Sequence, residues 1–94
     1  MIKSFRHAGI EKFFKTGSNV GIQPVHAAKH SIQLYALDAA KSPADLNTPG
    51  LRLHPLKGTL KGHWSIRVNG NWLLIFRFEA GNAILVDYQD YHGS

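Results

Sequence analysis

The 94-residue sequence contains no cysteine, which excludes disulfide bonds, thiolate nucleophiles and cysteine-ligated zinc. It also lacks an apolar run of about eighteen residues, the length that a membrane-spanning helix requires. The N-terminal segment MIKSFRHAGIEKFF has neither the apolar stretch nor the small-residue cleavage site of a secretory signal peptide. These absences predict a cytoplasmic protein that does not associate with membranes.

Acidic residues are also scarce, since 6 Asp and Glu stand against 11 Lys and Arg and the formal net charge is +5. The imbalance is largest between residues 41 and 77, where Asp45 is the single acidic residue. The basic residues of this stretch are Lys41, Arg52, Lys57, Lys61, Arg67 and Arg77. Such a balance favours an anionic partner, nucleic acid first, and the alternative is a basic surface that serves only solubility.

The chain is long enough for one hydrophobic core and too short for two, so we expect a single domain over residues 1–94. Its first half predicts two helices. The shorter one covers residues 7–15 and places Ile10, Phe13 and Phe14 on one face.

The longer helix is expected to begin at Pro24, because the first helical position leaves a backbone N–H unpaired and proline has none. Its predicted core-facing stripe recurs every three or four residues and consists of Val25, Ala28, Ile32, Tyr35 and Ala39, widened by Leu34 and Leu37. His26 and His30 then lie on the polar face. Their spacing could bind a metal, but the glutamate of an HExxH motif is missing, so we interpret both as surface residues.

The second half predicts strands at residues 51–56, 63–68, 71–78 and 83–88, and residues 2–5 can add a short edge strand. Asn69-Gly70 is a typical two-residue hairpin turn. Alternation assigns one inner face to Trp64, Ile66 and Val68, and to Trp72, Leu74, Phe76 and Phe78. The predicted class is α+β, with two N-terminal helices packed on a twisted antiparallel sheet. Arg67 and Arg77 belong to the opposite face, which is left for a ligand.

Two segments combine residue types that can carry chemistry. The loop LHPLKGTLKG, residues 53–62, holds His54, Lys57 and Lys61, which suit a phosphate site but also an ordinary solvated turn. The segment DYQDYH, residues 87–92, can be a frayed tail, although its two tyrosines argue against that. No glycine-rich phosphate loop and no nucleophile elbow occurs in the sequence.

Three motifs of the sequence resemble a known family. They are LxLHPLKG at residues 51–58, GxWSIRVNxNW at residues 62–72 and DYxDYH at residues 87–92. With the opening MIKSF and the order of the segments, they are similar to HigB-type toxins of the RelE/ParE superfamily, over nearly the whole chain. The resemblance implies a RelE-like fold, ribosome-dependent endonucleolytic cleavage of mRNA in the ribosomal A site, and inhibition by a helix-turn-helix, HigA-like antitoxin.

By position, the resemblance carries the family's active site onto His54, Lys57, Asp90, Tyr91 and His92. Cleavage of RNA by its own 2′-hydroxyl needs a base, an acid and positive charge at the phosphate, and no metal or cofactor. We predict His92 as base with Asp90 orienting it, Lys57 as charge stabiliser, His54 as acid or stacking group, and Tyr91 as a base-stacking or phosphate-binding residue. Lys61, Arg67 and Arg77 are predicted to bind RNA.

One departure from the family concerns Leu73, because many relatives have an arginine directly after the tryptophan of the NW pair. Arg77 lies four residues further along the same strand face and could partly replace that arginine. Two other functions stay open: a gyrase poison of the ParE type on the same fold, and a nucleic-acid-binding module without catalysis.

Overall fold

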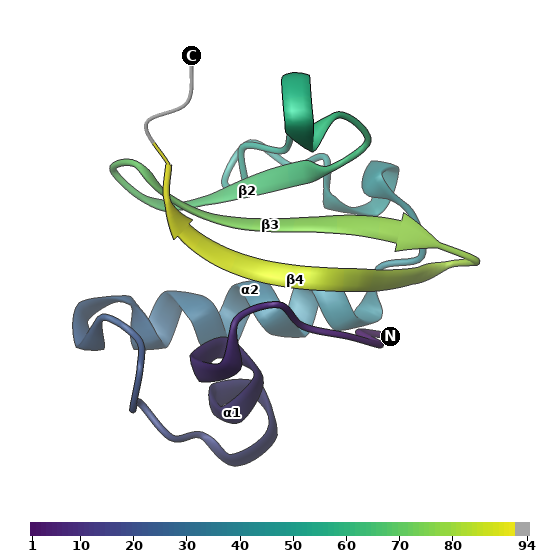
Figure 1. Cartoon of the computed structure of the whole chain (residues 1–94). Helices are drawn as coiled ribbons and strands as arrows, with labels where there is room; N and C mark the ends of the chain where they lie inside the picture. Colours follow the sequence, from purple (N-terminus) through teal and green to yellow (C-terminus); the bar gives the residue numbers. More distant parts are fainter. Residues whose placement is uncertain (92–94) are drawn as a thin grey trace.

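The computed structural model describes residues 1–91, which form two helices on one side of a four-stranded sheet (Figure 1). The helices are α1 (Ala8–Thr16) and α2 (Ala27–Ala39), with 3-10 turns η1 (Pro24–His26) before α2 and η2 (Pro43–Leu46) after it. The strands are β1 (His54–Pro55), β2 (Trp64–Asn69), β3 (Trp72–Glu79) and β4 (Asn82–Asp90), with a third turn η3 (Gly58–Leu60) between β1 and β2. The strand order β1-β2-β3-β4 is antiparallel throughout, which confirms the predicted α+β class.

The strands follow the predicted pattern, with differences at the two sheet edges. The predicted first strand shortens to His54–Pro55, because Pro55 has no N–H to donate and Arg52, at φ 51°, turns the chain out of the extended conformation. The N-terminal segment contributes two parallel bridges beside β4, Ile2 to Ala83 and Phe5 to Val86. Strand β4 is longer than predicted and reaches Asp90, so most of the C-terminal cluster is paired with β3.

The face of the sheet that meets the helices is apolar, as the alternation predicted. Ile66, Val68, Leu74 and Phe76 are completely buried, and the predicted neighbours Trp64, Trp72 and Phe78 pack against them while partly exposed. Helix α1 adds Ile10 to this core. Among the described residues, no helix is long and apolar enough to cross a membrane.

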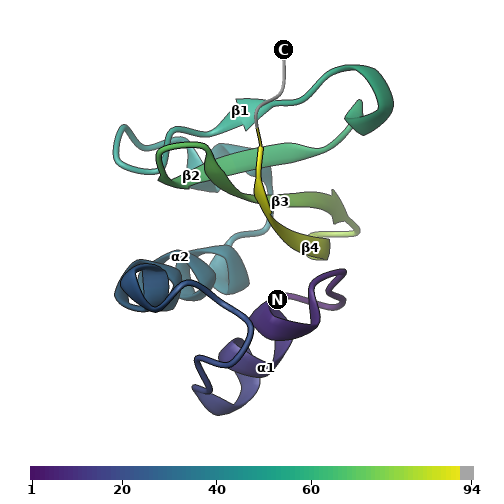
Figure 2. The same cartoon turned by 60° about the vertical axis from the view of Figure 1, so that its left-hand side comes forward.

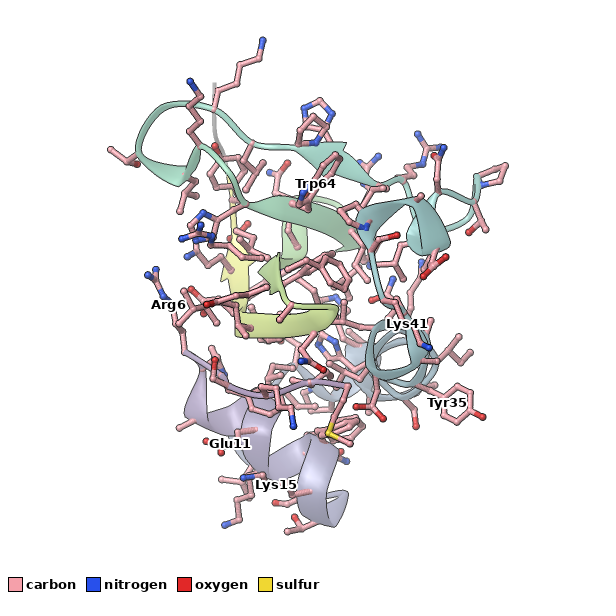
Figure 3. All side chains as sticks on the ribbon, turned by 90° about the vertical axis from the view of Figure 1, so that its right-hand side faces the viewer. Arg6, Glu11, Lys15, Tyr35, Lys41 and Trp64 are labelled. Atoms are coloured by element: carbon pink, nitrogen blue, oxygen red, sulfur yellow. The ribbon has the colours of Figure 1, made fainter. Side chains whose placement is uncertain are left out.

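The predicted core-facing stripe of the longer helix is wrong except at Leu34 and Leu37, which are buried. Val25, Ile32 and Tyr35 are 83%, 70% and 78% exposed, and Figure 3 shows Tyr35 projecting away from the sheet. The buried face of the helix carries Leu34 and Leu37 together with polar residues instead. Those polar residues are His26 and His30, which the sequence assigned to the surface, and Gln33.

The polar face turns inward because the sheet offers it partners. The Tyr88 hydroxyl oxygen accepts the backbone N–H of Gln23 at 3.4 Å and shares a 2.7 Å hydrogen bond with Nδ1 of His26. The side-chain amide of Gln33 donates to the backbone carbonyl of Arg67 at 2.7 Å. A buried polar group without a partner is costly, and a satisfied one specifies how the helix docks. The spacing of aliphatic residues along the helix does not reveal these bonds.

His30 differs from His26, since it is completely buried and neither ring nitrogen has a hydrogen-bond partner within the described part of the chain. Its ring packs edge-to-face on Tyr88, with centroids 4.5 Å apart. Burial lowers the pKa of His30 from 6.5 to about 4, and repulsion from His26 and His7 acts in the same direction. The histidine is therefore a neutral packing group.

This burial predicts a specific dependence of stability on pH. Because the folded protein resists protonation of His30, the unfolded chain binds the proton first as the pH falls below about 6.5. Its contribution to the free energy of unfolding should decrease by about 3 kcal/mol between pH 6.5 and about 4, and stay level below that. His30→Phe should remove this part of the pH dependence in denaturant titrations at several pH values. His54→Gln, at an exposed position, is the control, and equal pH profiles for His30→Phe and the unmodified chain would contradict the assignment.

Candidate active site

The sheet face away from the helices holds an open cleft of about 670 Å³. Figure 2 shows β1 and the chain on either side of it at the top of the view, with the other strands between them and the two helices. The cleft is lined by residues from three separate segments. The first includes Arg52, His54 and Lys57, the second includes Ser65, Arg67, Asn71 and Leu73, and the third contributes Tyr91. It therefore collects residues of the loop before β2, of the β2–β3 hairpin and of the end of β4.

Backbone hydrogen bonds hold the first segment against β2. His54 is the register partner of Ser65, the N–H of Leu56 donates to the carbonyl of His63 at 3.0 Å, and the carbonyl of Leu51 accepts the N–H of Arg67 at 3.0 Å. The segment is thus attached on both sides of His54. His54 and Lys57 are both exposed and reach the cleft from its edge.

The hairpin and the end of β4 supply the other side. Arg67 is the register partner of Leu73, and its Nε donates to the carbonyl of Gly70 at 3.0 Å, which holds the guanidinium at the cleft. The N–H of Tyr91 donates to the carbonyl of Asn71 at 2.7 Å, so the chain leaving β4 stays beside the turn of the hairpin. Residues far apart in the sequence therefore line one cleft.

The end of β4 is fixed from the opposite face of the sheet. Tyr88 packs on Trp72 with ring centroids 4.7 Å apart, and its hydroxyl is bonded to His26. Burial raises the pKa of Tyr88, so the phenol stays protonated and keeps a proton to donate. Because Tyr88 precedes Asp90 and Tyr91 by two and three positions, its contacts restrict where those residues can lie.

The predicted site residues are placed unequally. His54, Lys57, Tyr91 and Arg67 line the cleft, whereas Asp90, Lys61 and Arg77 are exposed but not among its lining residues. Asp90 is in register with Trp72, and alternation along the strand assigns it to the face of Tyr88. His92 lies outside the described residues.

Three side chains, among the described residues, have roles that the sequence did not predict. Arg52 lines the cleft, although only its position between two leucines of the LxLHPLKG motif marks it. His7 and His63, to which the sequence assigned nothing, serve the fold. His7 caps α1 by accepting the N–H of Ile10 at its Nδ1, and His63 lies with Nδ1 3.1 Å from the carbonyl oxygen of Leu60.

The electrostatics of the cleft are one-sided. Among residues 1–91, Arg52, Lys57 and Arg67 line it and no carboxylate does, and the ion pair found there is Lys15 with Glu11 on α1. Clustered cations beside an imidazole and a phenol can bind a phosphodiester and stabilise charge that develops on it. The described residues contain no group of three His, Asp or Glu side chains that could hold a metal ion.

Comparison with known proteins identifies relatives along the whole chain. Endoribonuclease HigB of Proteus vulgaris is 40% identical over 92 residues, which cover 98% of this chain and 100% of that protein. Toxin HigB-1 of Vibrio cholerae serotype O1 is 36% identical over 94 residues and 98% of each chain.

A solved structure shares the fold. A chain of the YoeB–YefM complex from Staphylococcus aureus superposes with a TM-score of 0.63 at 17% identity, over 99% of both chains. A sequence model of HigB-like toxins, described as the RelE-like toxin of the type II toxin–antitoxin system HigB, matches residues 3–92. The chain therefore belongs to the HigB-like family of RelE-like toxins, each of which has an antitoxin as its partner.

Proposed function

We propose that this chain is an endoribonuclease that cleaves mRNA on the ribosome and so inhibits translation. The observation that carries the proposal is the cleft in which His54, Lys57, Arg67 and Tyr91 converge without an acidic neighbour among its lining residues. The Proteus vulgaris relative bears the name endoribonuclease. A surface that only binds a partner does not need a proton carrier beside a cation, so the residue types favour catalysis over the gyrase poison or the simple binding module.

In the proposed reaction the 2′-oxygen of the RNA attacks the adjacent phosphorus, and the bond from phosphorus to the 5′-oxygen breaks. A base removes the 2′-hydroxyl proton, and an acid protonates the departing 5′-oxygen. The products are a 2′,3′-cyclic phosphate and a free 5′-hydroxyl, and the step needs neither metal nor cofactor. His92 is the proposed base, oriented by Asp90, and His54 is the proposed acid.

The remaining residues bind the RNA or stabilise the charge that develops on its phosphate. The ammonium group of Lys57 neutralises charge on the phosphorane oxygens, and Tyr91 stacks on a base or binds a phosphate. Arg67 contacts the phosphate backbone from the hairpin side of the cleft, where the Nε hydrogen bond to Gly70 holds its guanidinium. Lys61 and Arg77 lie outside the cleft lining, and we propose for them contacts to more distant phosphates.

The ribosome supplies what this small cleft cannot. A basic domain of this size binds many RNAs weakly, and holding the mRNA in a reactive geometry can contribute a large entropic factor to the rate. We therefore propose cleavage in the ribosomal A site, in the cytoplasm, with ribosomal RNA as a further contact. The antitoxin partner is proposed to be of the helix-turn-helix, HigA-like type.

Lys57→Ala is expected to slow cleavage roughly 100- to 1,000-fold, because a positive charge aimed at the transition state is lost. The melting temperature should stay close to that of the unmodified chain, since Lys57 is exposed. Single-turnover cleavage of mRNA on programmed ribosomes measures the rate. Lys12→Ala, which changes an exposed lysine of α1, controls for net charge and should cleave normally.

His92→Ala tests the proposed base, and the expected loss of cleavage rate is roughly 100- to 10,000-fold. Full activity of both site variants would reject the catalytic assignment and favour the gyrase poison or the binding module.

The reaction route has its own test. A 2′-O-methyl group on the nucleotide before the scissile bond should abolish cleavage, and unmodified mRNA should yield a 2′,3′-cyclic phosphate and a 5′-hydroxyl. A chelator selective for zinc and manganese, added to magnesium-containing ribosome buffer, should leave the rate unchanged. Cleavage of the 2′-O-methyl substrate at the same bond, or activity restored only by added zinc or manganese, would refute the proposed route.

A further inference from the structure

Next to the cleft lies a second, smaller hollow of about 190 Å³. Three of its lining side chains are cationic: Lys29 from α2, Arg52 from the loop before β1, and Arg67 from β2. Arg52, Arg67 and Gly70 line the cleft as well. The two hollows are therefore adjacent, and the smaller one lies on the side of the β2–β3 turn toward the start of α2.

Two hydrogen bonds to the backbone of Arg67 bring these three cations together. The Leu51 carbonyl accepts the N–H of Arg67, which places Arg52 beside β2. The Gln33 amide donates to the Arg67 carbonyl, which places the first turns of α2, and with them Lys29, against the same strand position. Arg52 adopts φ 51°, a left-handed conformation that is unfavourable for a residue other than glycine and persists only where surrounding contacts impose it.

The arrangement of these charges destabilises the protein when no ligand is bound. Three like charges line one small hollow, and within residues 1–91 no carboxylate forms an ion pair with any of them. Lys29 is also in the first turn of α2, where the helix dipole disfavours a cation. Neither feature helps folding, and both suit an anionic ligand. An apolar peptide would find little surface here, because Val68, an apolar residue of the lining, is itself buried.

We propose that Lys29, Arg52 and Arg67 form a binding subsite for an RNA phosphodiester beyond the scissile one. The inference rests on the proposed function, because the shared Arg52 and Arg67 make the subsite an extension of the catalytic cleft. The subsite predicts the path of the RNA: the strand leaves the cleft over the β2–β3 turn toward α2. The same chemistry would accept a phosphate of the substrate strand or of ribosomal RNA, and the residues shared by the two hollows favour the substrate strand.

Lys29 is the residue to test, since it lines the smaller hollow and not the cleft. Lys29→Ala removes its charge, and Lys29→Glu reverses it with a residue that suits the first turn of a helix. Lys12→Ala and Lys12→Glu, on exposed α1 surface, match the change in net charge. The probes are fully 2′-O-methylated RNA oligonucleotides, which cannot undergo 2′-hydroxyl attack: a dinucleotide that fills only the cleft and a longer strand that extends beyond it. Fluorescence anisotropy over a series of salt concentrations measures their binding to the full chain.

For the longer strand, Lys29→Ala should lower the slope of log affinity against log salt by about 0.7 relative to Lys12→Ala, the loss expected for one phosphate contact to a single strand. Lys29→Glu should weaken binding further, and the dinucleotide should bind all variants alike. If the lost contact appears instead with ribosomes that lack mRNA, the phosphodiester belongs to ribosomal RNA and the subsite is equally supported. Equal binding of the Lys29 and Lys12 variants to both probes and to ribosomes that lack mRNA would overturn it. So would a loss confined to antitoxin binding, which would assign the hollow to that partner.

The binding measurements do not depend on cleavage. A chain that fails to cleave mRNA but shows the Lys29 effect keeps the subsite and loses the nuclease proposal. A chain that cleaves mRNA through Lys57 without the Lys29 effect keeps the nuclease and loses the subsite. The two hypotheses therefore fail separately.

Discussion

The contacts of Tyr88 determine how the two layers of this protein meet. Its hydroxyl is bonded to His26 of η1, its ring lies on Trp72 of β3, and the rings of His30 and His7 approach it from α2 and from the cap of α1. One side chain of β4 thus connects both helices to the adjacent strand. A buried phenol with satisfied hydrogen bonds permits few alternative positions, so the docking of α2 and the position of the β4 end are fixed together.

This arrangement gives the two faces of the sheet separate tasks. Aliphatic and aromatic packing, with the buried His26 and His30, occupies the helix side, whereas cations occupy the other side around the cleft. Gln33 connects the two, because its amide on the helix side bonds the backbone of Arg67, whose side chain lies in the cleft. The position of a cleft residue therefore depends on a polar contact made within the core. That dependence explains why the buried face of α2 is not the most hydrophobic one.

The sequence predicts the parts of this structure that follow from local patterns. Alternating apolar residues correctly gave the inner faces of β2 and β3, and Asn69-Gly70 gave the turn between them. The buried face of α2 was predicted wrongly because partners distant in sequence, Tyr88 and the Arg67 carbonyl, determine it, and not the aliphatic residues of the helix. The convergence of His54 and Lys57 with Tyr91 was expected only through family resemblance, since spacing gives no distance. Lys29 carried no local signal, and Arg52 was marked only by its place in the basic stretch and in the LxLHPLKG motif, because only the fold brings the two together.

The leucine at position 73 shows how such a cleft can retain a guanidinium when an expected arginine is missing. Leu73 faces the cleft, and its partner across the β2–β3 ladder is Arg67. A guanidinium has five N–H donors, and Arg67 uses its Nε donor on Gly70, so four remain for a phosphate. Arg77, the replacement predicted from the sequence, is not among the lining residues of the cleft. The charge thus comes from the opposite strand of the same hairpin. Arg67 also lines the hollow beside Lys29, so the guanidinium that the cleft retains lies toward α2, along the path we propose for the RNA.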